Sequence, residues 1–89
     1  MTEIKVSSMS KTTHIAGCIA KTLRQQPTIS IYAIGANAVN QSVKAVAIAR
    51  GYLTGDGYDI VMQPRTELAE DLEDRTVIVM SLARVGGRP

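Results

Sequence analysis

The sequence contains no tryptophan and no phenylalanine, and its aromatic residues are three tyrosines. Any core must therefore be built from small aliphatic side chains. The single cysteine, Cys18, excludes an internal disulfide and suits a reducing cytosol. No apolar run approaches the roughly 20 residues that a membrane-spanning helix needs, and residues 1–13 lack the apolar segment of a secretion signal. We therefore expect a cytoplasmic protein that does not enter a membrane.

Groups that carry out catalysis or bind metals are equally scarce. His14 is the only histidine, and Cys18 lies four residues further on, which would place both on one side of a helix. Such a pair would fit nucleophilic catalysis or half of a metal site, but no third group or further ligand accompanies it. The acids between residues 67 and 74 lack the spacing of a calcium loop, and no glycine-rich phosphate motif occurs. We expect no enzymatic activity, no metal, no cofactor and no small-molecule substrate.

The length of 89 residues allows one small domain, and we expect residues 1–89 to form it, with a frayed tail at 84–89. Because so short a chain buries little area by itself, a homodimer is expected. Residues 1–50 hold six basic residues against the single acid Glu3, whereas residues 51–89 hold four arginines against seven acids. This asymmetry fits an anionic partner on the basic side, or simply two differently solvated faces.

The first half of the chain has the pattern of a strand, a helix and a second strand. Residues 3–7 alternate in polarity and predict a short strand, and a loop rich in hydroxyl groups follows. Residues 14–25 have helical periodicity, with Thr12 or Thr13 as the expected N-cap. Gly17 inside this helix predicts the close approach of another backbone, and Pro27 ends the helix. With a strand at 28–34, the two strands should be parallel.

A glycine turn at Gly35 leads into a second helix, expected at residues 36–52. One side of this helix is apolar and should be buried, a second is polar, and a flank of small residues between them predicts close packing. The apolar side consists of Val39, Val43, Val46 and Leu53, and the small flank of Ala38, Ser42, Ala45 and Ala49. Ile48 falls on the polar side, where it is either a subunit contact or a singly exposed apolar residue.

The last third of the chain predicts a hairpin. A third strand is expected at residues 58–63, ended by Pro64, and a solvated acidic loop at 66–74. A fourth strand at 75–83 is apolar on both faces around Val79 and should be central in the sheet. The predicted fold is a two-layer α+β domain of order βαβαββ, with two helices and a mixed four-stranded sheet.

If both helices cover one face of the sheet, their N-termini meet at one end of it. Polar side chains that suit a nucleic-acid backbone would gather there, namely Ser10, Lys11, Asn37, Asn40, Gln41 and Lys44. Lysines, amides and helix N-termini all interact favourably with phosphate groups. The alternative is that the hydroxyl groups only cap the helix and the amides and Lys44 are simply solvated.

Four segments resemble the stage V sporulation protein S family: KVSSMSK at residues 5–11, IAGCIAKTLR at 15–24, AIGANAVNQSVKAVAIARGYL at 33–53 and EDRTVIVM at 73–80. The likeness extends over about residues 4–82 and implies an Alba-like fold, a dimer, nucleic-acid binding, a regulatory role in sporulation and no enzymatic activity. Lys11 occupies the position of the basic loop that meets phosphates in Alba-like proteins. The turn at residues 34–37 lacks the arginines that are common there, Thr12 replaces the family's usual proline, and residues 64–73 are more acidic.

Our first hypothesis is therefore a dimeric, non-enzymatic regulator that binds DNA or RNA. Phosphates would contact Lys11, Lys44 and Arg50, while Ser10, Asn37, Asn40 and Gln41 would add hydrogen bonds. The second hypothesis is a regulatory protein-interaction module, in which the second helix with Ile48 forms the contact surface.

Overall fold

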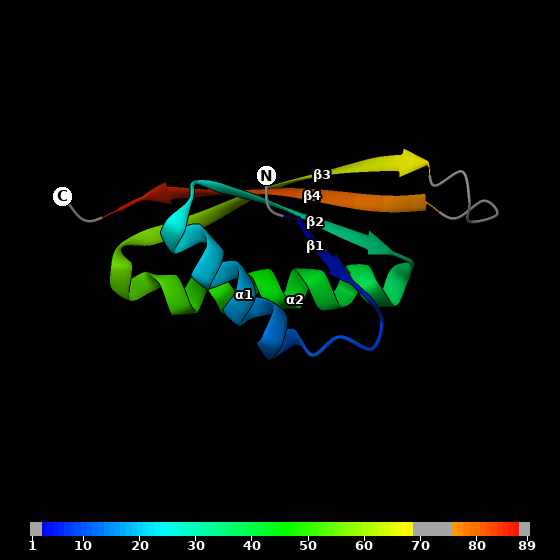
Figure 1. Ribbon diagram of the computed structural model, residues 1–89, viewed down its shortest axis with the longest axis horizontal. Helices are drawn as coiled ribbons and strands as arrows, with labels where there is room; N and C mark the ends of the chain where they lie inside the picture. Colours follow the sequence, from blue (N-terminus) through cyan, green and yellow to red (C-terminus); the bar gives the residue numbers. More distant parts are fainter. Residues whose placement is uncertain (1–2, 69–75, 88–89) are drawn as a thin grey trace.

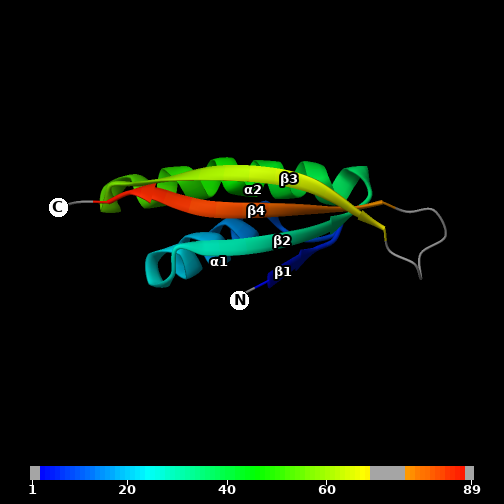
Figure 2. The ribbon, with the colours of Figure 1, turned by 90° about the horizontal axis from the view of Figure 1, so that it is seen from above.

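The structure is a computed structural model that describes residues 3–68 and 76–87. Its elements are β1 (Glu3–Val6), α1 (Thr12–Gln25), β2 (Thr28–Ile34), α2 (Ala36–Leu53), the short 3-10 helix η1 (Thr54–Asp56), β3 (Tyr58–Leu68) and β4 (Thr76–Gly86). Both helices lie on one face of the sheet (Figure 1), and the other face is uncovered (Figure 2). The predicted two-layer α+β fold is confirmed.

The sheet has the order β1-β2-β4-β3. β1 pairs with β2 in parallel, while β4 pairs antiparallel with both β2 and β3. The parallel strand–helix–strand unit, the terminal hairpin and the central position of β4 are therefore as predicted. Gly35, which opens α2, has a φ of 87°, so the turn between β2 and α2 uses a conformation that other residues rarely adopt.

The core lies between the helices and the covered face of the sheet. It is aliphatic, as the lack of tryptophan and phenylalanine requires, and its largest fully buried side chains include Ile19, Leu23, Ile29, Ile31, Leu53, Met80 and Leu82. α1 packs against α2, and the small flank of α2 is almost entirely buried, at Ala38, Ser42, Ala45 and Ala49. Small side chains therefore allow the close packing of α2 that the sequence predicted.

Both hairpin strands are longer than predicted. β3 continues through Pro64 to Leu68, because β3 is an edge strand and the N–H group that proline lacks is not needed on its free side. β4 continues to Gly86, and the Arg84 N–H donates to Pro27 O at 3.0 Å, so the frayed tail predicted from residue 84 is wrong for residues 84–86. Residues 66–68 of the predicted acidic loop belong to β3, and the rest of that loop lies outside the described residues.

Two predictions about α1 are wrong. The helix begins at Thr12, and its N-cap is Lys11, without a side-chain cap, rather than Thr12 or Thr13. Gly17 is exposed, and a Cβ placed on it would meet nothing within 4 Å, so no backbone approaches it closely. Neither threonine is needed as a cap, because the preceding serines form a turn of their own.

The apolar side of α2 is only partly buried. Val46 and Leu53 are in the core, but Val39 is half-buried and Val43 is 46% exposed, which contradicts its predicted burial. The buried side is rotated toward the small flank, because α2 packs on α1 as well as on the sheet. Ile48 is half-buried and packs against the core, so it is not singly exposed on a polar surface.

Candidate nucleic-acid interface

The loop between β1 and α1 is a compact turn held by its own serines. Ser10 N donates to Ser7 O at 3.2 Å, and Ser7 N donates to Ser10 Oγ at 3.1 Å. Met9 N donates to Ser7 Oγ at 3.2 Å, while the Met9 side chain is 87% exposed at the tip of the loop. Such local hydrogen bonds fix the loop backbone before any ligand arrives.

α2 holds this loop in place through one partly buried hydrogen bond. Gln41 Nε2 donates to Ser10 O at 2.8 Å, so the structure does bring the loop against the N-terminal half of α2. Lys11 follows directly as the N-cap of α1, with its side chain exposed. Ser10, Lys11 and Gln41 are thus gathered as the sequence predicted, but Gln41 orients the loop with its amide.

Asn37, Asn40 and Lys44 are exposed on α2. Within residues 3–68 and 76–87, none of the three makes a hydrogen bond to the loop. Asn40 instead borders a hollow of about 600 Å³ between α2 and β4, whose lining also includes Val39, Val43 and Ile78. These polar side chains share one end of the molecule with Lys11 and are free to meet a ligand from solvent.

Arg50 is not part of this group. It lies nine residues beyond Gln41, about 14 Å further along the helix axis, and its guanidinium donates to both carboxylate oxygens of Asp59, at 2.7 and 3.1 Å. The hydrogen bond and the charge of Asp59 raise the pKa of Arg50, and the pKa of Asp59 is lowered chiefly by its hydrogen bond to Arg50. Asp59 thus largely neutralises Arg50.

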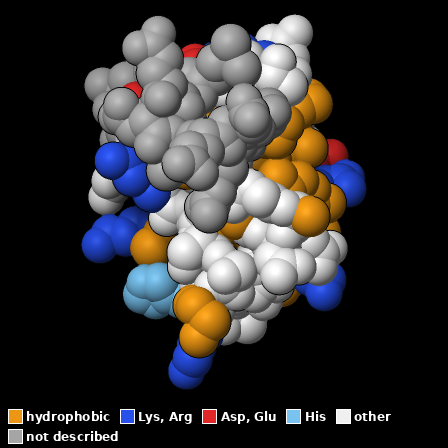
Figure 3. All heavy atoms as spheres, turned by 90° about the vertical axis from the view of Figure 1, so that its right-hand side faces the viewer, with side chains coloured by type: hydrophobic (Ala, Val, Ile, Leu, Met, Phe, Trp, Pro, Cys, Tyr) orange, Lys and Arg blue, Asp and Glu red, His pale blue; other side chains and the backbone are white. Residues whose placement is uncertain are grey.

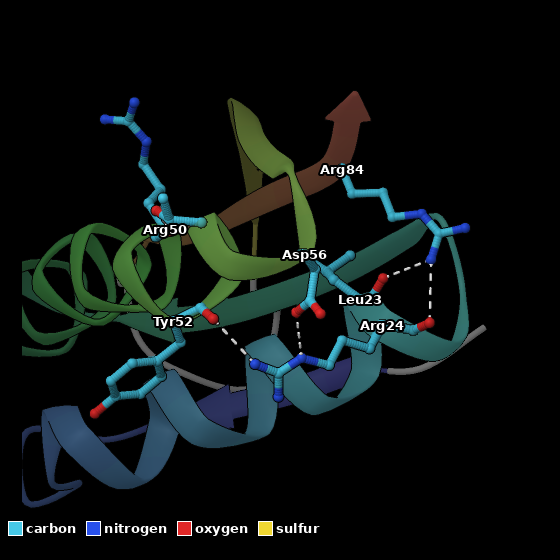
Figure 4. Close-up of polar contacts among 7 residues, drawn as sticks. Leu23, Arg24, Arg50, Tyr52, Asp56 and Arg84 are labelled. Atoms are coloured by element: carbon cyan, nitrogen blue, oxygen red, sulfur yellow. Dashed lines mark hydrogen bonds and ion pairs between the residues drawn. The ribbon is translucent and has the colours of Figure 1, made fainter. Parts of the chain in front are cut away.

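Two further arginines make internal contacts in the same region (Figure 4). Arg24 pairs with Asp56 at 2.8 Å and donates to Tyr52 O at 3.0 Å. Arg84 donates to Leu23 O at 2.7 Å and to Arg24 O at 3.3 Å, and its guanidinium lies 4.7 Å from the Tyr58 ring centroid. Arginines at the C-terminal ends of both helices therefore tie the fold together.

The lysines are in a different situation. Residues 4–55 contain no aspartate or glutamate, and in the described part of the chain none of the exposed lysines Lys5, Lys11, Lys21 and Lys44 has an ion-pair partner. Figure 3 shows basic side chains projecting from both flanks and the bottom of the end that carries the loop. Sequence reasoning missed Lys5 and Lys21, although the long acid-free stretch was visible in the sequence.

Other chemistry is sparse in the described residues. His14 and Cys18 are both exposed on α1, and no group of three or more His, Cys, Asp or Glu residues that could hold a metal occurs within the described ranges. The search of the same residues finds no helix with the length and apolarity needed to cross a membrane.

The fold places the chain among Alba-like α+β proteins. The solved structure of Alba from Thermoplasma volcanium matches with a TM-score of 0.62 at 19% sequence identity, and the match covers 93% of this chain and 100% of that one. At this identity the likeness establishes the fold alone. Residues 2–85 match the stage V sporulation protein S (SpoVS) family, and the chain belongs to that family.

Proposed function

We propose that the protein is a non-enzymatic, cytoplasmic regulator in sporulation that binds DNA or RNA as a dimer, through backbone phosphates. Membership of the SpoVS family supports the sporulation role. The observation that carries the nucleic-acid proposal is the division of the basic residues. Arg24 and Arg50 are neutralised by Asp56 and Asp59, whereas the lysines near the β1–α1 loop have no acidic partner among the described residues. Unpaired lysines beside a preorganised loop suit a polyanion.

One observation favours the second candidate function, a protein-interaction module. The hollow between α2 and β4 is largely apolar, and Val43 is 46% exposed on its rim. An apolar hollow of this kind fits a protein surface better than it fits a phosphate backbone. A second copy of the chain could cover it, in agreement with a dimer, and a different protein partner is the alternative.

The test is fluorescence anisotropy with labelled duplex DNA and single-stranded RNA at several salt concentrations. We expect Lys11→Gln and Lys44→Gln to weaken binding of both probes and each to lower the slope of log K against log salt by about 0.7 to 0.9. Arg50→Gln is the matched control, because it removes one positive charge that Asp59 already neutralises. It should leave affinity within about twofold, since a screened surface pair contributes little to the outer field.

If neither probe binds at low salt, the nucleic-acid proposal fails and the interaction module is favoured. If Arg50→Gln weakens binding as much as Lys11→Gln does, nucleic acid is bound but the proposed surface is misplaced.

A further inference from the structure

A second hollow lies on the other side of Lys11, between the edge strand β1 and the first half of α1. Its volume is about 440 Å³, within the range of small-molecule sites. It is lined by Ile4 and Lys5 from β1, Ser10 and Lys11 from the loop, and His14, Ile15 and Cys18 from α1. Figure 2 shows β1 at the sheet edge, with α1 under the same side of the sheet.

The lining separates charge from apolar surface. Lys5, Lys11 and His14 bring basic groups from three parts of the chain, and no acid is among the lining residues. Glu3, the only acid before residue 56, lies instead near Tyr32, where its carboxylate and that of Glu67 raise the pKa of the tyrosine hydroxyl. The cationic side of the hollow is therefore not neutralised from within.

The floor of the hollow is apolar and ordered. Ile15 is 4% exposed and belongs to the core, and Ile4 is half-buried against the same core. Ser10 adds a polar group whose backbone is fixed by Gln41. His14 adds an exposed imidazole ring, a flat group on which a nucleic-acid base can stack.

We propose that this hollow binds one phosphorylated nucleotide, with the phosphate held by Lys5 and Lys11 and the base against His14 and the two isoleucines. The inference deepens the proposed function and rests on it, because the hollow shares Ser10 and Lys11 with the proposed interface. The shared chemistry is a nucleotide, either free or within a single strand. A paired base in a duplex is stacked and cannot enter, whereas an unpaired base can turn outward.

The test compares single-stranded RNA with a duplex of the same sequence, using variants that change one charge each. Lys5→Gln should weaken binding of the single strand about five- to tenfold, in line with loss of a hydrogen bond to a charged group, and should change duplex binding by less than about twofold. Lys21→Gln is the matched control, because it removes the same charge from an exposed α1 lysine outside the hollow. It should affect the two probes equally and weakly.

NMR titrations with AMP, adenosine and inorganic phosphate separate the possible ligands. The proposal expects AMP to shift the amide signals of Ser10, His14 and Cys18 in the wild type and much less in Lys5→Gln. Shifts with inorganic phosphate but none with adenosine would contradict the base contact. If the polymers do not bind but AMP shifts these amides, the proposed function fails and the hollow is a free-nucleotide site. If Lys5→Gln has no selective effect and AMP leaves these amides unmoved while Lys44→Gln still weakens the polymers, the hollow is excluded and the proposed function stands.

Discussion

Single residues of the same charge have different roles in this molecule. Arg24 and Arg84 bind backbone carbonyl groups near the helix C-termini, and Arg50 binds a carboxylate of β3. The planar guanidinium group can make several directed hydrogen bonds at once, which a lysine ammonium group does less well. The lysines extend into solvent, where a strongly hydrated point charge can meet a mobile ligand.

The Arg50–Asp59 pair predicts a particular dependence of stability on pH. The pKa of Asp59 is lower in the folded chain than in the unfolded chain, so the unfolded state takes up a proton first as the pH falls. The pair therefore stabilises the fold above the unfolded-state pKa, and this contribution is lost as the pH falls from about 5 through the folded-state pKa. We expect Asp59→Asn to be less stable than the wild type at pH 7 and nearly equal to it at the acid end. Urea unfolding at several pH values measures the difference, and a gap that stays constant down to the lowest pH would contradict this assignment.

At the scale of whole elements, local pattern was enough where local geometry decides the structure. The alternation at residues 28–34 gives β2 with the predicted bounds, and Gly35 opens α2 with a positive φ. Tertiary context decided the rest. Pro64 interrupts an inner strand but not an edge strand, and the sequence does not show which strand is at the edge. Val43 has the same local pattern as Val46, but only the placement of α1 decides which of them is covered.

The candidate site was predictable to a similar extent. The contact of Gln41 with Ser10 follows from two helices that begin at the same end of a parallel unit. The neutralisation of Arg50 could not be foreseen, because Asp59 is on a strand whose register depends on β4. Lys5 was also missed, since the hollow that it lines exists only when β1 and α1 are packed together.

The packing between the helices predicts a pair of contrasting substitutions on α2. Ala45 is fully buried in the small flank, and a larger side chain there must push the helices apart. We expect Ala45→Leu to lower the free energy of unfolding by about 1–3 kcal/mol. Ala47→Leu makes the same change on the exposed side and should have little effect. Chemical denaturation of both variants measures this, and equal stabilities would mean that the helices can separate at little cost.

At the scale of the whole molecule, the hollow between α2 and β4 predicts the oligomeric state. Val43 is the most exposed apolar residue of its lining, and a dimer through this surface would bury it. We expect the wild type to be a dimer and Val43→Glu a folded monomer, because a buried, unpaired carboxylate opposes association. Ala47→Glu adds the same charge to an exposed position outside the hollow and should remain dimeric. Analytical ultracentrifugation distinguishes these states. A monomeric wild type, or a dimer that survives Val43→Glu, would contradict the prediction.

The position of β4 has a consequence for synthesis of the chain. β4 is the last strand to leave the ribosome, yet it lies between β2 and β3 and pairs with both. β1, α1 and β2 are adjacent in sequence and can begin to pair early, but one edge of β2 has no partner until residues 76–86 emerge. A nascent chain therefore carries an open strand edge for most of its translation, and such edges are the sites at which incomplete chains associate with one another. Efficient production of this protein thus depends on how quickly its final strand is delivered.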